Sequence, residues 1–198
     1  MQTIAVDVDD VLSLSAEAFL EFSNKRWGTK LAIGDFQENF GAMWQIDDPD
    51  AAARFKIMAE EGIHGTYKSA DYAETVLRRL KKHYKLVITT SRTKTIASIT
   101  AEWLERHMPG IFEEIHHTGF YDSIEDFYKA HTATKAELCR QIGADYLIDD
   151  QPKHCIAAGE LGIKSLLFGD YPWSNEVQLN DNVVRIKDWK KVGEYFNV

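Results

Sequence analysis

Near its start the chain reads Thr3-Ile4-Ala5-Val6-Asp7-Val8-Asp9-Asp10-Val11, an apolar, largely β-branched run that passes into three acidic residues within four positions. The apolar part predicts a buried β-strand. Carboxylates gathered at one strand end repel one another, so the pattern makes poor folding sense unless a cation lies among them. Asp7 and Asp9 would project to the same face of a regular strand, where their oxygens suit Mg²⁺. A plainer interpretation stays open, in which the acidic residues end the strand and cap a helix beginning near Ser13 or Ser15.

The composition is that of a globular protein with one good core and room for a small accessory domain, at 198 residues. Its longest apolar runs fall well short of the roughly 18 residues that a membrane span needs. The net charge of −8 disfavours binding to a nucleic acid polymer. Two cysteines, Cys139 and Cys155, are too few for a disulfide framework and are typical of helix packing. The start lacks the pattern of a secretory signal, so we expect a cytoplasmic protein.

The rest of the chain alternates helices and strands. A first helix should end at Gly28, and a mainly helical stretch over 30–70 should contain a helix from Asp48-Pro49 to just before Gly62. We expect strands at 84–89, 114–117, 146–148, 165–168 and 183–186, and helices at 71–83 (capped by Ser69), 95–107, 134–141 (capped by Thr134), 152–161 and 189–196. The stretch 119–133 is polar and aromatic, and its sequence leaves its conformation open. This alternation indicates a parallel sheet covered by helices on both faces, with ligands at the carboxyl ends of the strands.

Four polar features fall at those strand ends or at helix starts: Asp7-x-Asp9, Thr90-Ser91-Arg92, Lys135 and Asp149-Asp150. Together they suit phosphoryl transfer, because carboxylates can attack phosphorus and bind a metal while hydroxyls, Lys135 and Arg92 receive phosphate oxygens. Each feature also has a plain alternative. The hydroxyl pair and the acidic pair could cap helices, Lys135 could face solvent, and Arg92 could form a surface ion pair.

In type and order these four features resemble the motifs of the haloacid dehalogenase superfamily of phosphotransferases. The resemblance implies an α/β fold, with a Rossmann-like parallel sheet and helices on both faces, and a small helical cap inserted after the first strand. The catalytic core would comprise residues 1–14 and 72–198, and the cap residues 15–71. The cofactor would be Mg²⁺ and the substrate a small phosphorylated molecule.

The resemblance also implies a role for each acidic residue. Asp7 would be the nucleophile, and Asp9 would protonate the leaving group and then activate water. Mg²⁺ would be held by the Asp7 carboxylate, the Asp9 carbonyl and Asp150, with Asp149 supporting Asp150 or Lys135. Asp150 is preferred over Asp149 as the ligand because Ile-Asp-Asp-Gln-Pro resembles members in which the second acidic residue meets the metal.

Two further stretches, 147–152 and Phe168-Gly169-Asp170-Tyr171-Pro172-Trp173-Ser174, resemble the 5′(3′)-deoxyribonucleotidase-like branch of the superfamily. This resemblance implies a nucleoside monophosphate substrate, although Trp173 could equally cover the edge of the core. Aromatic residues of the expected cap could stack on a base, but they are more typical of a small core of their own: Phe36, Phe40, Trp44 and Phe55.

Three alternatives remain at this stage. The protein could hydrolyse another small phosphorylated metabolite, or be a catalytically silent module that binds nucleotides or partners. A receiver domain also gathers acidic residues around Mg²⁺, but its phosphoacceptor would end a middle strand, whereas the third strand here ends in Ile115-His116-His117. The sequence predicts neither the base or sugar preference nor the oligomeric state.

Overall fold

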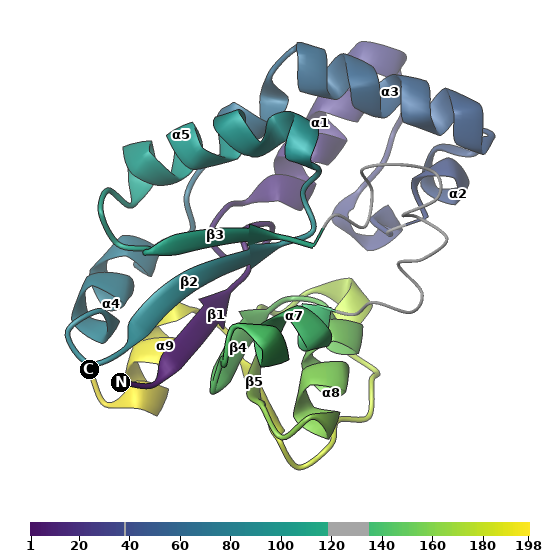
Figure 1. The fold of residues 1–198 in the computed structure, drawn as a ribbon. Coiled ribbons are helices and arrows are strands. Elements are labelled where there is room, and N and C mark those ends of the chain that lie inside the picture. The colour runs from purple at the N-terminus through teal and green to yellow at the C-terminus, as the bar shows by residue number, and fades with distance from the viewer. Residues whose placement is uncertain (38, 119–134) are drawn as a thin grey trace.

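The computed structural model describes residues 1–37, 39–118 and 135–198. The stretch 119–133 and Thr134, the expected cap of a helix, lie outside the described residues. Within the described ranges the strands are β1 (Thr3–Val6), β2 (Lys85–Thr90), β3 (Glu114–His117), β4 (Tyr146–Asp149), β5 (Lys164–Phe168) and β6 (Val183–Ile186). They form one sheet in the order β3-β2-β1-β4-β5-β6, and each neighbouring pair is parallel (Figure 1). The predicted parallel α/β sheet is therefore confirmed.

The acidic turn follows the central strand of this sheet. β1 pairs with β2 on one side and β4 on the other, with Val6 opposite both Ile88 and Ile148. Because all three strands run in the same direction, their carboxyl ends meet at one edge, and the residues that follow them lie close together.

The helices of the described residues are α1 (Ser15–Trp27), α2 (Phe40–Trp44), α3 (Asp48–Glu60), α4 (Ala73–Leu80), α5 (Ala97–His107), α7 (Lys135–Gln141), α8 (Pro152–Glu160) and α9 (Trp189–Phe196). Short 3₁₀ turns occupy Ile33–Asp35, Ile63–Gly65, Lys94–Ile96 and Pro172–Ser174. Gly28, with φ 68°, ends α1 as predicted. Among these helices none has the length and apolar character to cross a bilayer.

Two helices begin two residues later than predicted: α5 begins at Ala97 after the 3₁₀ turn Lys94–Ile96, and α4 also lacks its predicted cap. α4 begins at Ala73 rather than near Asp71, and no side chain caps it, so the prediction of Ser69 as its cap is wrong. Ser69 instead forms a β-bridge to Ser13, and the amide of Ala70 donates to the carbonyl of Leu12. The backbone before the helix is therefore used to pair with the chain leaving the acidic turn.

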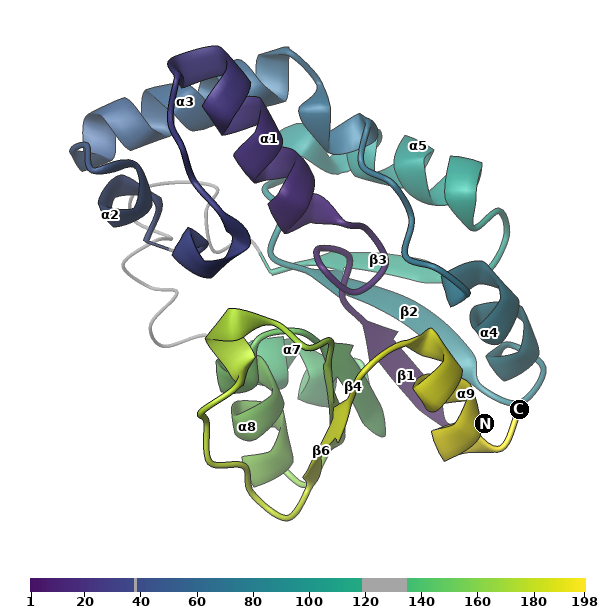
Figure 2. The ribbon, with the colours of Figure 1, turned by 180° about the vertical axis from the view of Figure 1, so that it is seen from behind.

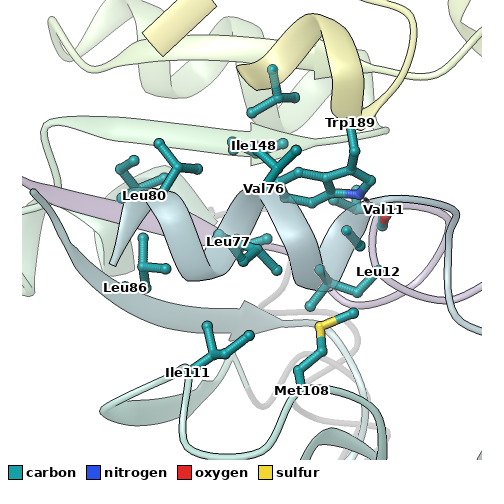
Figure 3. Packing of buried hydrophobic residues seen from close by; sticks show 14 of the residues in the cluster. Val11, Leu12, Val76, Leu77, Leu80, Leu86, Met108, Ile111, Ile148 and Trp189 are labelled. Carbon is teal, nitrogen blue, oxygen red and sulfur yellow. Dashed lines mark hydrogen bonds between the residues drawn. The ribbon is translucent and has the colours of Figure 1, made fainter. Parts of the chain in front are cut away.

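Two hydrophobic layers cover the sheet. Ile4 and Val6 of β1 pack with α4, α5 and α9 on one face, and Ala5 packs with α7 and α8 on the other (Figure 2). On the first face Val11 and Leu12 lie beside one end of α4, and the indole nitrogen of Trp189 donates to the carbonyl of Val11 at 2.9 Å (Figure 3). The chain that leaves the acidic turn is thus held in the hydrophobic core through Val11 and Leu12.

The inserted segment, residues 15–71, lies beyond the carboxyl ends of the strands (Figure 1). It has a separate hydrophobic cluster, in which the ring of Phe19 stacks on Trp44 at 5.3 Å. The four aromatic residues considered for base stacking all belong to this cluster or pack against it, which confirms the interpretation as a small core: Phe36, Phe40, Trp44 and Phe55. The division into a core and a cap at residues 14 and 72 stays a prediction.

Candidate active site

Three of the expected site residues meet at the carboxyl edge of the sheet. Asp7 directly follows β1, Thr90 ends β2 and Asp149 ends β4. The amide of Asp7 still donates to the carbonyl of Ile148 at 2.9 Å, which keeps Asp7 beside the end of β4. The sheet therefore brings Asp7 and Asp149 together, although they lie far apart in the sequence.

Lys135 lies between these two carboxylates. Its Nζ is 2.6 Å from Oδ2 of Asp149 and 3.0 Å from Oδ2 of Asp7, and all three side chains are almost fully buried. Burial alone would lower the pKa of Lys135, but the two carboxylates outweigh it and raise that pKa. The side chain is thus a fixed positive charge at the site, and the alternative of a solvent-facing lysine is wrong.

A group of carboxylates has the spacing of a metal site. Asp7, Asp149 and Asp150 each offer one oxygen within 4.8 Å of the others. Burial raises the pKa of Asp7 to about 8, although Lys135 lowers it, and burial together with Asp149 raises that of Asp150. Oδ1 of Asp7 is buried, and no group in the described part of the chain bonds to it. An excess of buried carboxylate oxygen with one oxygen unpaired fits a divalent cation such as Mg²⁺.

The two residues of the acidic pair have different partners. Asp149 accepts hydrogen bonds from Lys135 at 2.6 Å and from the amide of Gln151 at 2.9 Å. Oδ2 of Asp150 accepts from the side-chain nitrogens of Gln151 and Trp173, both at 2.9 Å. This arrangement agrees with Asp149 supporting Lys135, and the choice of Asp150 as the metal ligand stays a prediction.

Arg92 is engaged with Asp9 rather than exposed. Its Nε and Nη2 donate to the two carboxylate oxygens of Asp9 at 2.9 and 2.8 Å, and Nη1 donates to Thr100 at 3.3 Å. Burial would raise the pKa of Asp9, but the guanidinium outweighs it and lowers the pKa. The alternative of a surface ion pair is wrong because Arg92 is buried. Contact between Arg92 and phosphate stays a prediction.

The third acidic residue has a structural task. Asp10, at φ 57°, accepts hydrogen bonds from the Ser15 hydroxyl at 2.8 Å and from the amide of Ala16 at 3.0 Å. It therefore satisfies the first turn of α1, as the plainer interpretation of the acidic turn proposed. That interpretation accounts for Asp10, whereas Asp7 and Asp9 face the cationic side chains of Lys135 and Arg92.

The hydroxyl pair lies at the end of β2. Thr90 is buried and its Oγ1 accepts from the amide of Arg92 at 3.2 Å, while Ser91 is half-buried in the turn that follows. This bond does not cap the next helix, because α5 begins only at Ala97. The phosphate-binding roles of Thr90 and Ser91 stay predictions.

Sequence reasoning missed several contacts of the site. It did not find the Arg92–Asp9 pair, nor His64, whose burial lowers its pKa to about 4 beside Arg92 and Asp9. It also missed the bond from Trp173 to Asp150. The only signal for the last was the tract 168–174, which resembled the nucleotidase branch without indicating what Trp173 would touch. Cys139 and Cys155 are free and buried, as expected of packing residues.

Comparison with known proteins identifies the family of the chain. Residues 1–119 match the family described as 5′ nucleotidase, deoxy (Pyrimidine), cytosolic type C protein. "Putative nucleotidase YqfW" of Bacillus subtilis is 24% identical over 208 residues, covering 100% of this chain and 94% of its own length. A "Putative 5′(3′)-deoxyribonucleotidase" of Staphylococcus epidermidis is 26% identical over 199 residues, covering 99% of this chain and 96% of its own.

Solved structures show the same fold. A haloacid dehalogenase-like family protein of Streptococcus pneumoniae aligns with a TM-score of 0.71 at 16% identity, over 99% of this chain and 98% of that protein. A predicted phosphatase from Clostridium acetobutylicum aligns with a TM-score of 0.72 at 16% identity, with the same coverage. The chain therefore belongs to the deoxy (pyrimidine), cytosolic type C family of 5′-nucleotidases and is a phosphomonoester hydrolase with the haloacid dehalogenase fold.

Proposed function

We propose that the protein is a Mg²⁺-dependent nucleotidase that works through a phosphorylated Asp7. The observation that carries this proposal is the pair of oxygens on Asp7. Oδ2 is held by Lys135 at 3.0 Å, and Oδ1 is buried without a partner in the described residues. A buried carboxylate with one oxygen fixed and one unsatisfied is poised to bind a ligand or to attack an electrophile.

In the first step an oxygen of Asp7 attacks phosphorus. A bond forms between Asp7 and phosphorus, the ester bond to the leaving oxygen breaks, and Asp9 gives that oxygen a proton. In the second step water attacks the same phosphorus while Asp9 takes its proton, so inorganic phosphate leaves and Asp7 is restored. Bound Mg²⁺ would supply positive charge against the carboxylates and the phosphate oxygens.

Other residues bind and orient the phosphate. We assign its oxygens to Thr90, Ser91 and Lys135, because these groups lie at the same strand edge. We assign the metal to the Asp7 carboxylate, the Asp9 carbonyl and Asp150. Asp149 holds Lys135 in place and thereby keeps a cation against the developing negative charge.

Arg92 has a proposed part in the proton transfer by Asp9. In the structure its guanidinium binds Asp9 and favours the ionised form, which cannot donate a proton. An arriving phosphate would compete with Asp9 for the same guanidinium. Transfer of Arg92 to the phosphate weakens the effect that keeps Asp9 ionised. Asp9 then takes up a proton from solvent and gives it to the leaving group.

The substrate class rests on the family. A nucleoside monophosphate is supported by the family match and by the name of the Staphylococcus epidermidis relative. The inserted segment, residues 15–71, is proposed as a cap that covers the phosphate and keeps bulk water from the intermediate. Another small phosphate ester is the alternative substrate.

The test is phosphate release from a panel of nucleoside monophosphates and other small phosphate esters, with Mg²⁺ or with EDTA. Asp7→Asn should abolish phosphate release and keep a cooperative thermal transition. Asp188 caps α9 far from the site, so Asp188→Asn should release phosphate at the rate of the unchanged protein. Appreciable activity in Asp7→Asn would exclude Asp7 as nucleophile. A non-nucleotide ester at the top of the panel would exclude the nucleotidase assignment, and no release from any compound would favour a silent binding module.

A further inference from the structure

Trp173 contacts both the acidic cluster and the inserted segment. It lies after β5, in the 3₁₀ turn Pro172–Ser174, and its side chain is half-buried. Its indole Nε1 donates to Oδ2 of Asp150 at 2.9 Å. An indole nitrogen only donates, so the carboxylate oxygen of Asp150 is the acceptor of this bond.

The turn around Trp173 is built to hold the indole in one place. Gly169 has φ +88°, and a Cβ there would lie 2.2 Å from the ring of Tyr171, so only glycine leaves room for that ring. The Tyr171 hydroxyl donates to the carbonyl of Asp10 at 2.8 Å. The rings of Tyr171 and Trp173 stack at 4.5 Å with an interplanar angle of 4°. The indole is therefore fixed through Tyr171 to the acidic turn itself.

The bond from Trp173 falls on the same oxygen that Gln151 uses. The side-chain amide of Gln151 also donates to Oδ2 of Asp150, at 2.9 Å. Two donors on one oxygen fix the rotation of the Asp150 carboxylate about its Cβ–Cγ bond. They thereby set the direction in which Asp150 presents its carboxylate to Asp7 and Asp149.

The other side of the indole touches the inserted segment. The ring centroids of Phe36 and Trp173 are 5.1 Å apart. Phe36 also packs edge-to-face against Phe19 in the aromatic cluster, with 5.9 Å between the ring centroids. Trp173 is thus in contact with an acidic residue of the core through its nitrogen and with residues 15–71 through its ring.

We propose that Trp173 is a positioning residue, whose indole nitrogen orients Asp150 as a ligand for Mg²⁺ and whose ring ties that ligand to the inserted segment through Phe36. This rests on the proposed function, in which Asp150 is a metal ligand. Metal bound to Asp150 would restrict Trp173, and Trp173 would then restrict the segment at Phe36. Reciprocally, loss of either contact should weaken Mg²⁺ binding.

The first test is calorimetric titration of the metal-free protein with Mg²⁺. Trp173→Phe keeps an aromatic ring but removes the donor, and it should raise the Kd for Mg²⁺ by about 10-fold or more, as loss of a partner to a metal ligand commonly does. Trp27→Phe makes the same change inside the segment's own cluster and should alter that Kd by less than about 2-fold. Thermal unfolding shows whether each variant is folded. Phe36→Leu, which leaves Trp173 in place, should raise the Kd by a smaller factor.

The second test is amide hydrogen exchange with and without Mg²⁺. Binding should slow exchange around residues 33–36 in the unchanged protein but not in Trp173→Phe. Wild-type Mg²⁺ affinity in folded Trp173→Phe would overturn the proposal while leaving the proposed function intact. An exchange rate at residues 33–36 that does not change when Mg²⁺ is added would overturn the proposed link between Trp173 and the inserted segment. Failure of the unchanged protein to bind Mg²⁺ would instead overturn the metal dependence of the proposed function.

Discussion

Replacing Lys135 with methionine should sharply destabilise the metal-free protein. The Nζ of Lys135 lies 2.6 Å from Asp149 and 3.0 Å from Asp7, and these side chains are 1%, 0% and 8% exposed. At an effective dielectric constant of about 20, a fully ionised contact at these distances corresponds to about 6 kcal/mol of Coulomb attraction. The contact with Asp7 contributes less than this at pH 7, because burial raises the pKa of Asp7 to about 8. Desolvation of the three groups offsets much of this. Removing one partner of a buried ion pair typically costs about 3–5 kcal/mol, which is the loss expected for Lys135→Met.

The assay is urea unfolding in EDTA at pH 7, followed by a probe of secondary structure. Lys56→Met is the matched control, because Lys56 is exposed and its ion pair among the described residues is with Glu60 one turn away, so it should cost less than about 0.5 kcal/mol. The slope of the free energy against urea should stay constant, which shows that the change lies in stability rather than in the unfolded state.

The physical cause is checked by pH and by a second substitution. Without Lys135, Asp7 and Asp149 would be relieved by binding protons, so the loss should be smaller at pH 5 than at pH 7. Asp149→Asn in the Lys135→Met background should recover part of it, because one buried charge is then absent. A loss below about 1 kcal/mol for Lys135→Met, or one that is equal at both pH values, would refute the reasoning that a buried charge is left uncompensated.

Three other predictions concern Asp9, His64 and Phe19. Asp9→Asn should slow both leaving-group protonation and hydrolysis of the intermediate, and steady-state turnover at the wild-type rate would exclude an acid–base role. Burial and then Arg92 lower the pKa of His64 from 6.5 to about 4, although Asp9 raises it, so the stability it contributes above pH 6.5 is lost as pH falls toward 4. The free energy of unfolding of His64→Gln should therefore fall less than that of the unchanged protein between pH 6.5 and pH 4, by up to about 1.4 kcal/mol per pH unit. Urea unfolding at each pH measures this difference, and an equal fall in both proteins would contradict it. Phe19→Ala should cost about 3–5 kcal/mol of local stability and accelerate amide exchange over 15–71 more than in the sheet; uniform acceleration would count against a separate cap.

The acidic cluster could be predicted because it depends on backbone topology. A parallel sheet brings the carboxyl ends of its strands to one edge, so residues following β1 and β4 must meet there. Asp7, Lys135 and Asp149 are therefore found together, as the order of the motifs indicated. The helix α3 of the aromatic segment was predictable for a different reason, since Asp48-Pro49 and Gly62 are local start and stop signals in a stretch without strand-like alternation.

The missed contacts depend on side-chain directions in turns. Arg92 follows β2 by two residues, and whether it reaches outward to solvent or back to Asp9 is decided by the loop conformation, which no periodicity describes. Trp173 reaches Asp150 only because Gly169 and Tyr171 shape the turn before it. The start of α4 was misplaced because the Ser69–Ser13 bridge is a long-range pairing that overrides a local capping signal.

The conflict posed by three neighbouring carboxylates is resolved residue by residue. Asp10 is satisfied by the first turn of α1, Asp9 by the guanidinium of Arg92, and one oxygen of Asp7 by Lys135. After these local partners are assigned, the other oxygen of Asp7 stays unpaired among the described residues and faces a cluster that includes Asp149 and Asp150. Protein cations therefore neutralise the turn only in part. The remaining carboxylate oxygens are concentrated at one edge of the sheet, which is the place where we propose that Mg²⁺ and the phosphate group bind.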